Sequence, residues 1–318
     1  MIKINFFECD RLLKGLSQLY NIEEPKIIST VAESGIKEDR LEYFLKQTSI
    51  KLDMVDINDV VLHCKHVMTT DDNFEALKRY GLITLDKVMK LNTPLHEFLQ
   101  VHGIEVDVEN RIINYKSKKA YLYEVDEECT NCFYGEGCKY LTYLNGEKTN
   151  LTYRNMACDY RKGISNLRTK LYSDKSEIEV HLAGEEEDVK DYSVVKYYPE
   201  ILLTIEELIW KLFGENPHLT DDWRKKQNNR YFCLDFDVSI FKFERITSMP
   251  IFSNDYDYYE YNEKPLDNRT SKNFYGNLFI LDNAIRVLSA EKPTLYGQLL
   301  PSVNIPFNNI TISEYKIL

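Results

Sequence analysis

The sequence predicts an α+β fold in which a split, mixed or antiparallel sheet follows a helical N-terminal segment. Within residues 1–58 the apolar positions, among them Leu12, Leu16 and Leu19, recur at helical spacing. Residues 59–67 form a short, apolar, β-branched run, as in a buried strand. Residues 231–243 alternate like a long strand or hairpin arm. Two domains follow from this pattern: a helical cap over 1–58 and a larger domain over 59–318.

Start and stop signals place the elements after the first strand. Residues 69–72, Thr-Thr-Asp-Asp, are of the types that cap helix N-termini, and they predict a helix that runs to about Tyr80. Gly81 is suited to end that helix in the left-handed conformation. A second helix is predicted over 85–101, with an interruption at Pro94.

The remaining elements follow from periodicity. We expect helices over 155–172 and 199–213, strands over 177–182 and from 295 onward, and exposed loops over 184–191 and 254–265. The loop 254–265 is unusually rich in tyrosine. Residues 278–288 fit a strand or a helix equally well.

Composition limits the class of protein. The 318 residues are 43% hydrophobic and 29% charged, as in globular proteins. A net charge of -11 argues against non-specific binding to nucleic acid, which depends on Lys and Arg neutralising phosphates. No apolar run reaches the roughly 18 residues of a spanning helix, so we expect no membrane partner. Seven cysteines, an odd number, favour a reducing compartment, and we expect a cytoplasmic protein.

Four of the cysteines cluster in a predicted insertion over about 118–160. Cys129, Cys132, Cys138 and Cys158 are separated by two, five and nineteen residues. Four thiolates can complete a tetrahedral Zn²⁺ site with no open position, so the metal would be structural. The alternative is four ordinary cysteines in a loop-rich insertion.

Residues 63–82 resemble the opening block of ADP-ribosyltransferases of the toxin and poly-ADP-ribose-polymerase type. In that family a strand carries a histidine that holds the ribose of NAD, and a helix ending in Gly-Leu follows. His63 and Lys65, with Gly81 and Leu82, match the order and spacing. The resemblance implies a transferase-like core and an NAD site at His63 and Lys65. Lys65 departs from the Ser or Thr that is common at its position.

Residues 298–310 resemble the closing strand of the same family. That strand begins at a catalytic glutamate and leads to an Ile-Pro pair, which here is Ile305-Pro306. Gln298 occupies the glutamate position. The middle motif of the family corresponds either to Tyr275-Gly276 or to Thr247-Ser248, and Tyr275 is our candidate for contact with NAD.

The substitution at position 298 matters because NAD cleavage develops positive charge on the nicotinamide ribose. A carboxylate stabilises that charge, and an amide does not carry it, a loss worth on the order of 10²–10⁴ in rate. Gln298 would therefore mark a natural pseudoenzyme, a deliberate substitution that disarms a toxic enzyme, or a strand residue outside any such family.

Two functional hypotheses follow. The first is an ADP-ribosyltransferase-like toxin or phage-defence effector that takes NAD as substrate and modifies a protein or nucleic acid acceptor. The second is a non-enzymatic recognition protein, whose zinc module and tyrosine-rich segment 254–263 bind an antitoxin or phage protein. The position of that segment relative to His63 would discriminate between them.

Overall fold

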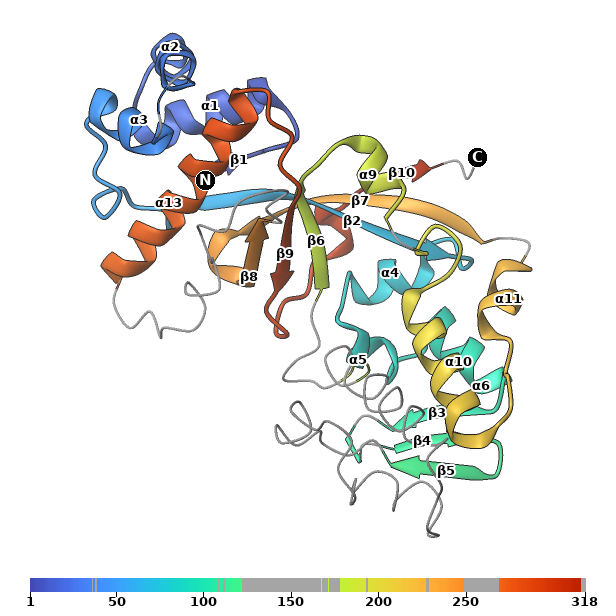
Figure 1. Ribbon diagram of the computed structural model, residues 1–318. Coiled ribbons are helices and arrows are strands. Elements are labelled where there is room, and N and C mark those ends of the chain that lie inside the picture. Colours follow the sequence, from blue (N-terminus) through green and yellow to red (C-terminus); the bar gives the residue numbers. More distant parts are fainter. Residues whose placement is uncertain are drawn as a thin grey trace, which may run out of the picture.

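The protein is a mixed α/β molecule built around a seven-stranded sheet, as the computed structural model in Figure 1 shows. The structure describes residues 1–35, 37, 39–107, 109–110, 112–121, 167, 171, 178–192, 194–226, 229–248 and 269–315. The strands follow the order β10-β7-β2-β6-β9-β8, with β1 pairing with β2. Their bounds are β1 Ile2–Ile4, β2 Val60–Thr70, β6 Ile178–Ala183, β7 Arg230–Ser239, β8 Phe243–Ser248, β9 Leu295–Leu299 and β10 Thr311–Tyr315.

Strand β2 organises this sheet. It pairs with β7 in antiparallel register from Val61 to Thr70. On its other side, its first three residues pair in parallel with β1, and Lys65 at its middle pairs with His181 of β6. Its first five residues are all buried, and exposure begins at Lys65. The apolar first half of β2 is therefore sequestered in the core, while the more polar second half borders a cavity described below.

The N-terminal helices share one core with the sheet. Helices α1 (Cys9–Tyr20), α2 (Glu24–Ser34) and α3 (Arg40–Thr48) pack with α13 (Arg269–Leu288) at one end of the molecule. The segment predicted as a separate cap thus contributes β1 to the main sheet and apolar side chains to the same core. Residues 278–288, which fitted either period, are helical.

Helix α13 is held against the N-terminal segment by a buried amide. Asn277 is fully buried, its Nδ2 donates to the carbonyls of Leu52 and Val55 at 2.9 Å each, and its Oδ1 accepts from the Tyr20 hydroxyl at 3.0 Å. A buried amide whose donor and acceptor groups all form hydrogen bonds fixes how two elements meet, because any other arrangement would leave a buried polar group without a hydrogen-bond partner.

A second core lies at the other end of the molecule, below the sheet in Figure 1. Around the buried Trp223 it collects α5 (Leu85–Val88), α6 (Pro94–Val101), α10 (Glu200–Phe213), α11 (Leu219–Arg224) and a three-stranded antiparallel sheet of β3 (Ile104–Asp107), β4 (Ile112–Tyr115) and β5 (Lys118–Tyr121). Helix α4 (Glu75–Tyr80) instead buries Leu77 in the first core.

Several sequence predictions are confirmed here. The strand at 59–67, the helices near 75–80 and 199–213, and the break before Pro94 all occur, and Thr93 caps α6 by accepting from the His96 N–H at 3.3 Å. Two details were wrong. The acidic segment 184–191 contains a short helix, α9 (Glu186–Lys190), and Gly81 has φ +74° with ψ -173°, which is extended rather than helical.

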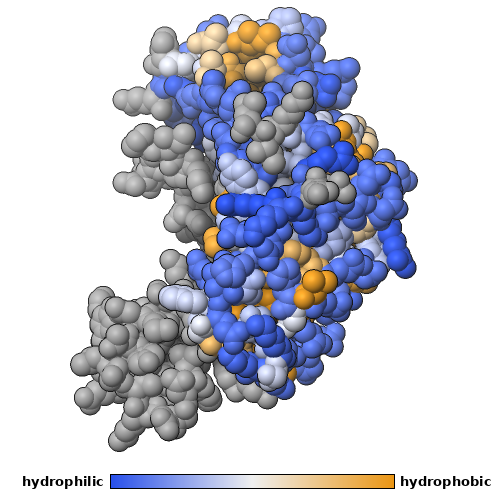
Figure 2. Space-filling view, turned by 90° about the vertical axis from the view of Figure 1, so that its right-hand side faces the viewer, coloured by the Kyte–Doolittle hydropathy of each residue, from blue (hydrophilic) through white to orange (hydrophobic). Residues whose placement is uncertain are grey.

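The surface seen in Figure 2 is mostly hydrophilic, with hydrophobic side chains gathered at its top, level with α2. Ile28 of α2 is 52% exposed. Within the described ranges, no helix has the length and apolar character needed to cross a membrane.

Candidate functional site

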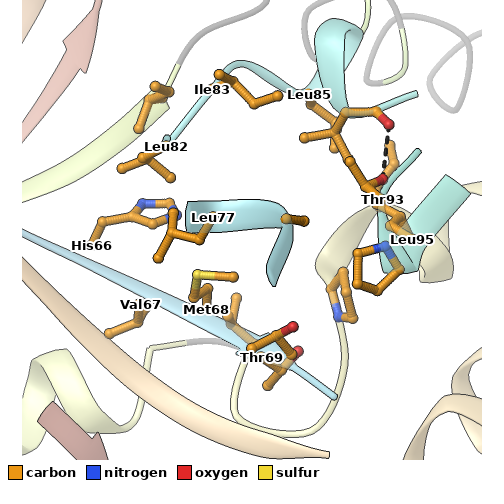
Figure 3. Close-up of a pocket in the computed structure, with 18 of the residues that line it drawn as sticks. His66, Val67, Met68, Thr69, Leu77, Leu82, Ile83, Leu85, Thr93 and Leu95 are labelled. Atoms are coloured by element: carbon orange, nitrogen blue, oxygen red, sulfur yellow. Dashed lines mark hydrogen bonds between the residues drawn. The ribbon is translucent and has the colours of Figure 1, made fainter. Parts of the chain in front are cut away.

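The main cavity lies between the sheet and the second core and has a volume of about 500 Å³. Figure 3 shows His66 and Met68 of β2 pointing toward Leu77 of α4 and Leu82. Further walls come from β6, β9, the start of α10 and Trp223 of α11. The size falls within the range of small-molecule sites, and the lining is largely apolar with a few polar groups, as such sites usually are.

The wall that follows β2 is held in place by a capping residue and a short bridge. The Asp72 carboxylate accepts from the N–H groups of Phe74 and Ala76, at 2.9 and 2.8 Å, and so starts α4. Just past α4, the N–H of Leu82 donates to the carbonyl of Ile305 at 2.9 Å, and the return bond measures 3.1 Å. Two segments more than 200 residues apart therefore meet beside the cavity.

The opposite wall is a cross-strand pair. Glu179 of β6 and Gln298 of β9 are directly opposite in the antiparallel register, and both line the cavity. Opposite residues of antiparallel strands project to the same face with Cβ atoms about 5 Å apart. Two residues further along β6, His181 also lines the cavity, and its ring contacts Tyr296 of β9 at 4.9 Å between centroids.

Both histidines of the cavity are neutral near pH 7. Burial lowers the pKa of His66 and lowers that of His181 to about 4, with the charge of neighbouring groups adding to the shift at His181. His66 Nδ1 lies 2.7 Å from the carbonyl oxygen of Glu179. Since a carbonyl only accepts, Nδ1 carries the proton and Nε2 of His66 is an acceptor.

Two buried polar atoms of the cavity lining have no hydrogen-bond partner among the described residues. They are Oγ1 of Thr69 and Nδ1 of His181, whose side chains belong to residues 6% and 3% exposed. Leaving a buried polar atom unpaired costs about 1–3 kcal/mol, and both atoms are buried within the cavity wall rather than exposed to the cavity.

The charge of the cavity is one-sided. Its charged lining residues are Asp72, Glu179 and Glu200, and no Lys or Arg occurs among the described residues that line it. Tyr192 and Trp223 add aromatic surface. Carboxylates and aromatic faces together favour a cationic, flat group over an anionic one.

His63 and Lys65 lie in a different cavity. Adjacent side chains along a strand point to opposite faces, so His63 and Lys65 share one face of β2 while His66 faces the other. This second cavity, of about 550 Å³, is also lined by Asp235 and Asp237 of β7. His63 contacts both carboxylates, at 3.4 Å from Asp235 and 2.9 Å from Asp237. The structure thus does not bring His63 together with Gln298.

The His63 cluster is an internal charge network. Burial opposes a charge on His63, but hydrogen bonds with Asp235 and Asp237 outweigh it and raise the pKa of the imidazole. The same bonds outweigh burial at both carboxyls and lower their pKa values. Lys3 pairs with Asp237 at 2.8 Å and Lys65 with Asp235 at 3.7 Å. Each charge therefore already has a partner within the protein.

The other expected site residues lie away from the main cavity or outside the described residues. Tyr275 lies on α13, where its ring contacts Phe274, and it lines neither cavity. Thr247 and Ser248 close strand β8. The zinc candidates Cys129, Cys132, Cys138 and Cys158, residues 122–160 of the predicted insertion and the tyrosine-rich segment 254–263 fall outside the described residues. Within the described residues, no three His, Cys, Asp or Glu side chains group as a metal site.

Sequence reasoning missed His66 and Glu179. The strand period could have indicated His66, because side chains an odd number of residues apart on a strand point to opposite faces. His63 and Lys65 therefore share one face, and His66 lies on the other. Glu179 carried no such signal, since only strand pairing places it beside Gln298.

Comparison with protein-family models, curated proteins and solved structures found no match to this chain.

Proposed function

We propose that the main cavity binds the nicotinamide riboside end of NAD and that the protein is ADP-ribosyltransferase-like. The observation that carries this proposal is the convergence of two sequence blocks on one cavity. Residues 66–82 of the block 63–82 supply one wall, Gln298 of the block 298–310 supplies part of the other, and Leu82 bridges to Ile305. These are the two segments whose resemblance to ADP-ribosyltransferases suggested an NAD site.

The chemistry of the lining supports the same ligand. The nicotinamide ring of NAD is a flat cation, and it suits a cavity with three carboxylates, four aromatic side chains and no described Lys or Arg. Ribose hydroxyls suit the neutral polar groups. Nε2 of His66 is an acceptor for a hydroxyl hydrogen.

His66 replaces His63 in this proposal. His66 lines the cavity that contains Gln298, whereas His63 is committed to Asp235 and Asp237. The acceptor of the ADP-ribosyl group, and a role as a toxin or phage-defence effector, stay predictions. So does the structural zinc, which metal analysis of the purified protein and of a Cys129→Ser, Cys132→Ser variant would test.

The two histidines of β2 give the experiment a matched control. Calorimetric titration of NAD would be performed on the unmodified protein, on His66→Ala and on His63→Gln, with thermal melts to verify folding. We expect NAD to bind the unmodified protein and His63→Gln, and to bind His66→Ala at least about 10-fold more weakly, the loss of one buried hydrogen bond. No binding to the unmodified protein would refute the proposal. Loss in His63→Gln alone would move the site to the second cavity.

A further inference from the structure

The main cavity has a carboxylate next to the amide of Gln298. Glu179 is the cross-strand partner of Gln298, and both side chains line the cavity. An amide at position 298 lacks the charge that NAD cleavage requires, but the adjacent strand places a charge about one Cβ–Cβ spacing, roughly 5 Å, away. Such a distance is within the reach of one ligand ribose.

We propose that Glu179 is the catalytic carboxylate of this site and that Gln298 serves as its hydrogen-bonding neighbour. This inference rests on the NAD site proposed above. On this inference the protein is an active enzyme whose catalytic carboxylate lies on β6. It is not a pseudoenzyme that lost activity because position 298 is Gln.

The surroundings of Glu179 fix its orientation without neutralising it. The Tyr192 hydroxyl donates to Oε1 of Glu179 at 2.8 Å, and the Tyr192 ring packs edge-on against His181 at 4.9 Å between centroids. No Lys or Arg forms an ion pair with Glu179 among the described residues. One carboxylate oxygen is therefore held by a neutral donor, and the full negative charge stays available to a ligand.

The negative charge of Glu179 shifts the pKa values of the two neighbouring tyrosines, Tyr192 and Tyr296. Burial raises the pKa of Tyr192 and Tyr296, and the Glu179 carboxylate raises both further. Tyr192 is thus a protonated donor at neutral pH. On β2, His66 donates from Nδ1 to the Glu179 carbonyl, which ties the strand carrying His66 to the residue that carries the charge.

The step that this arrangement supports is the transfer of ADP-ribose from NAD to an acceptor. The bond between C1′ of the ribose and the nicotinamide nitrogen breaks, and its electron pair leaves with nicotinamide as a neutral molecule. The acceptor heteroatom forms the new bond to C1′ and gives up its proton. Glu179 stabilises the positive ribose between these events and takes the acceptor's proton. With water as acceptor, the products are ADP-ribose, nicotinamide and a proton.

The test is nicotinamide release from NAD by four proteins, with NAD affinity measured in parallel. They are the unmodified protein, Glu179→Gln, Glu179→Asp, and Glu314→Gln as a charge-matched control on the distant edge strand β10. We expect Glu179→Gln to lower release by about 10²–10⁴-fold with NAD affinity changed less than about 10-fold. Glu179→Asp keeps the charge and should retain more activity than Glu179→Gln, and Glu314→Gln should match the unmodified protein.

Other outcomes separate this inference from the proposed function. Nicotinamide release that survives Glu179→Gln would overturn the role of Glu179 and leave the NAD site standing. NAD binding without release by the unmodified protein, with release gained on Gln298→Glu, would also overturn it and assign the charge to position 298. If neither the unmodified protein nor Gln298→Glu releases nicotinamide although NAD binds, the catalytic role of Glu179 is also overturned, and the protein is a nucleotide-binding pseudoenzyme. Absence of NAD binding would remove both proposals.

Discussion

Replacing Gly81 by Ala should destabilise the protein and loosen the wall of the main cavity. Gly81 has φ +74° and ψ -173°, and it ends α4 immediately before Leu82 bridges to Ile305. A Cβ built on Gly81 would overlap the carbonyl oxygen of Ile305, which is the acceptor of that bridge. It would also overlap Oδ1 of the Asn304 side chain. That side chain can rotate away, but the Ile305 carbonyl belongs to the backbone and can move only if the bridge itself shifts.

Two costs add at this position. A non-glycine residue in the glycine-only region at positive φ and extended ψ costs about 1–3 kcal/mol. Forcing an extra carbon into a closed site costs about 1–3 kcal/mol more. The expected loss in the free energy of unfolding is thus about 2–6 kcal/mol, against a total of about 5–15 kcal/mol for a typical protein.

Gly214 supplies the control. It has φ +69° and ψ 15° at the end of α10, and a Cβ there would meet nothing within 4 Å. Gly214→Ala should therefore lose only the left-handed cost of about 1–2 kcal/mol. Urea denaturation of the two variants, with NAD titration of each, would measure both effects. We expect Gly81→Ala to be less stable than Gly214→Ala and to bind NAD more weakly.

Equal destabilisation of the two variants would refute the close approach of Gly81 to Ile305. Unchanged NAD affinity in Gly81→Ala, with stability lost, would show that the bridge supports the fold without shaping the ligand site. The two effects are separable, because urea denaturation measures the backbone strain and NAD titration measures the geometry of the cavity.

Two further predictions concern parts of the core away from the main cavity. Because the pKa of His63 is raised by Asp235 and Asp237, its charge stabilises the protein fully below about pH 6.5, and that stabilisation is lost as the pH rises through the higher folded-state value. The midpoint of thermal unfolding should fall across that range, and His63→Gln should abolish this slope; an unchanged slope would contradict the assignment. Gly276→Ala should cost about 1–3 kcal/mol because its Cβ would overlap Cδ1 of the buried Ile57. Ile57→Val removes that atom, so urea denaturation of the double variant should show less destabilisation than the sum of the two singles, and strict additivity would argue against the contact.

Local chemistry in the sequence was sufficient for several elements. Pro94 marked the interruption between α5 and α6, and the apolar, β-branched run before His63 marked β2. These patterns depend on caps, proline geometry and side-chain period, which act over a few residues. The short helix α9 was missed because acidic residues in a first turn look the same in an exposed loop.

The sequence by itself determined that helices precede a mixed or antiparallel sheet, and from the resemblance of residues 63–82 and 298–310 it predicted an NAD site. Only the tertiary structure decided which histidine of β2 faces Gln298, because one step along a strand reverses the face of a side chain. It alone placed Glu179 opposite Gln298, since residues 119 positions apart in the chain become neighbours only through strand register. Our proposal assigns to Glu179, on the adjacent strand, the charge that position 298 lacks.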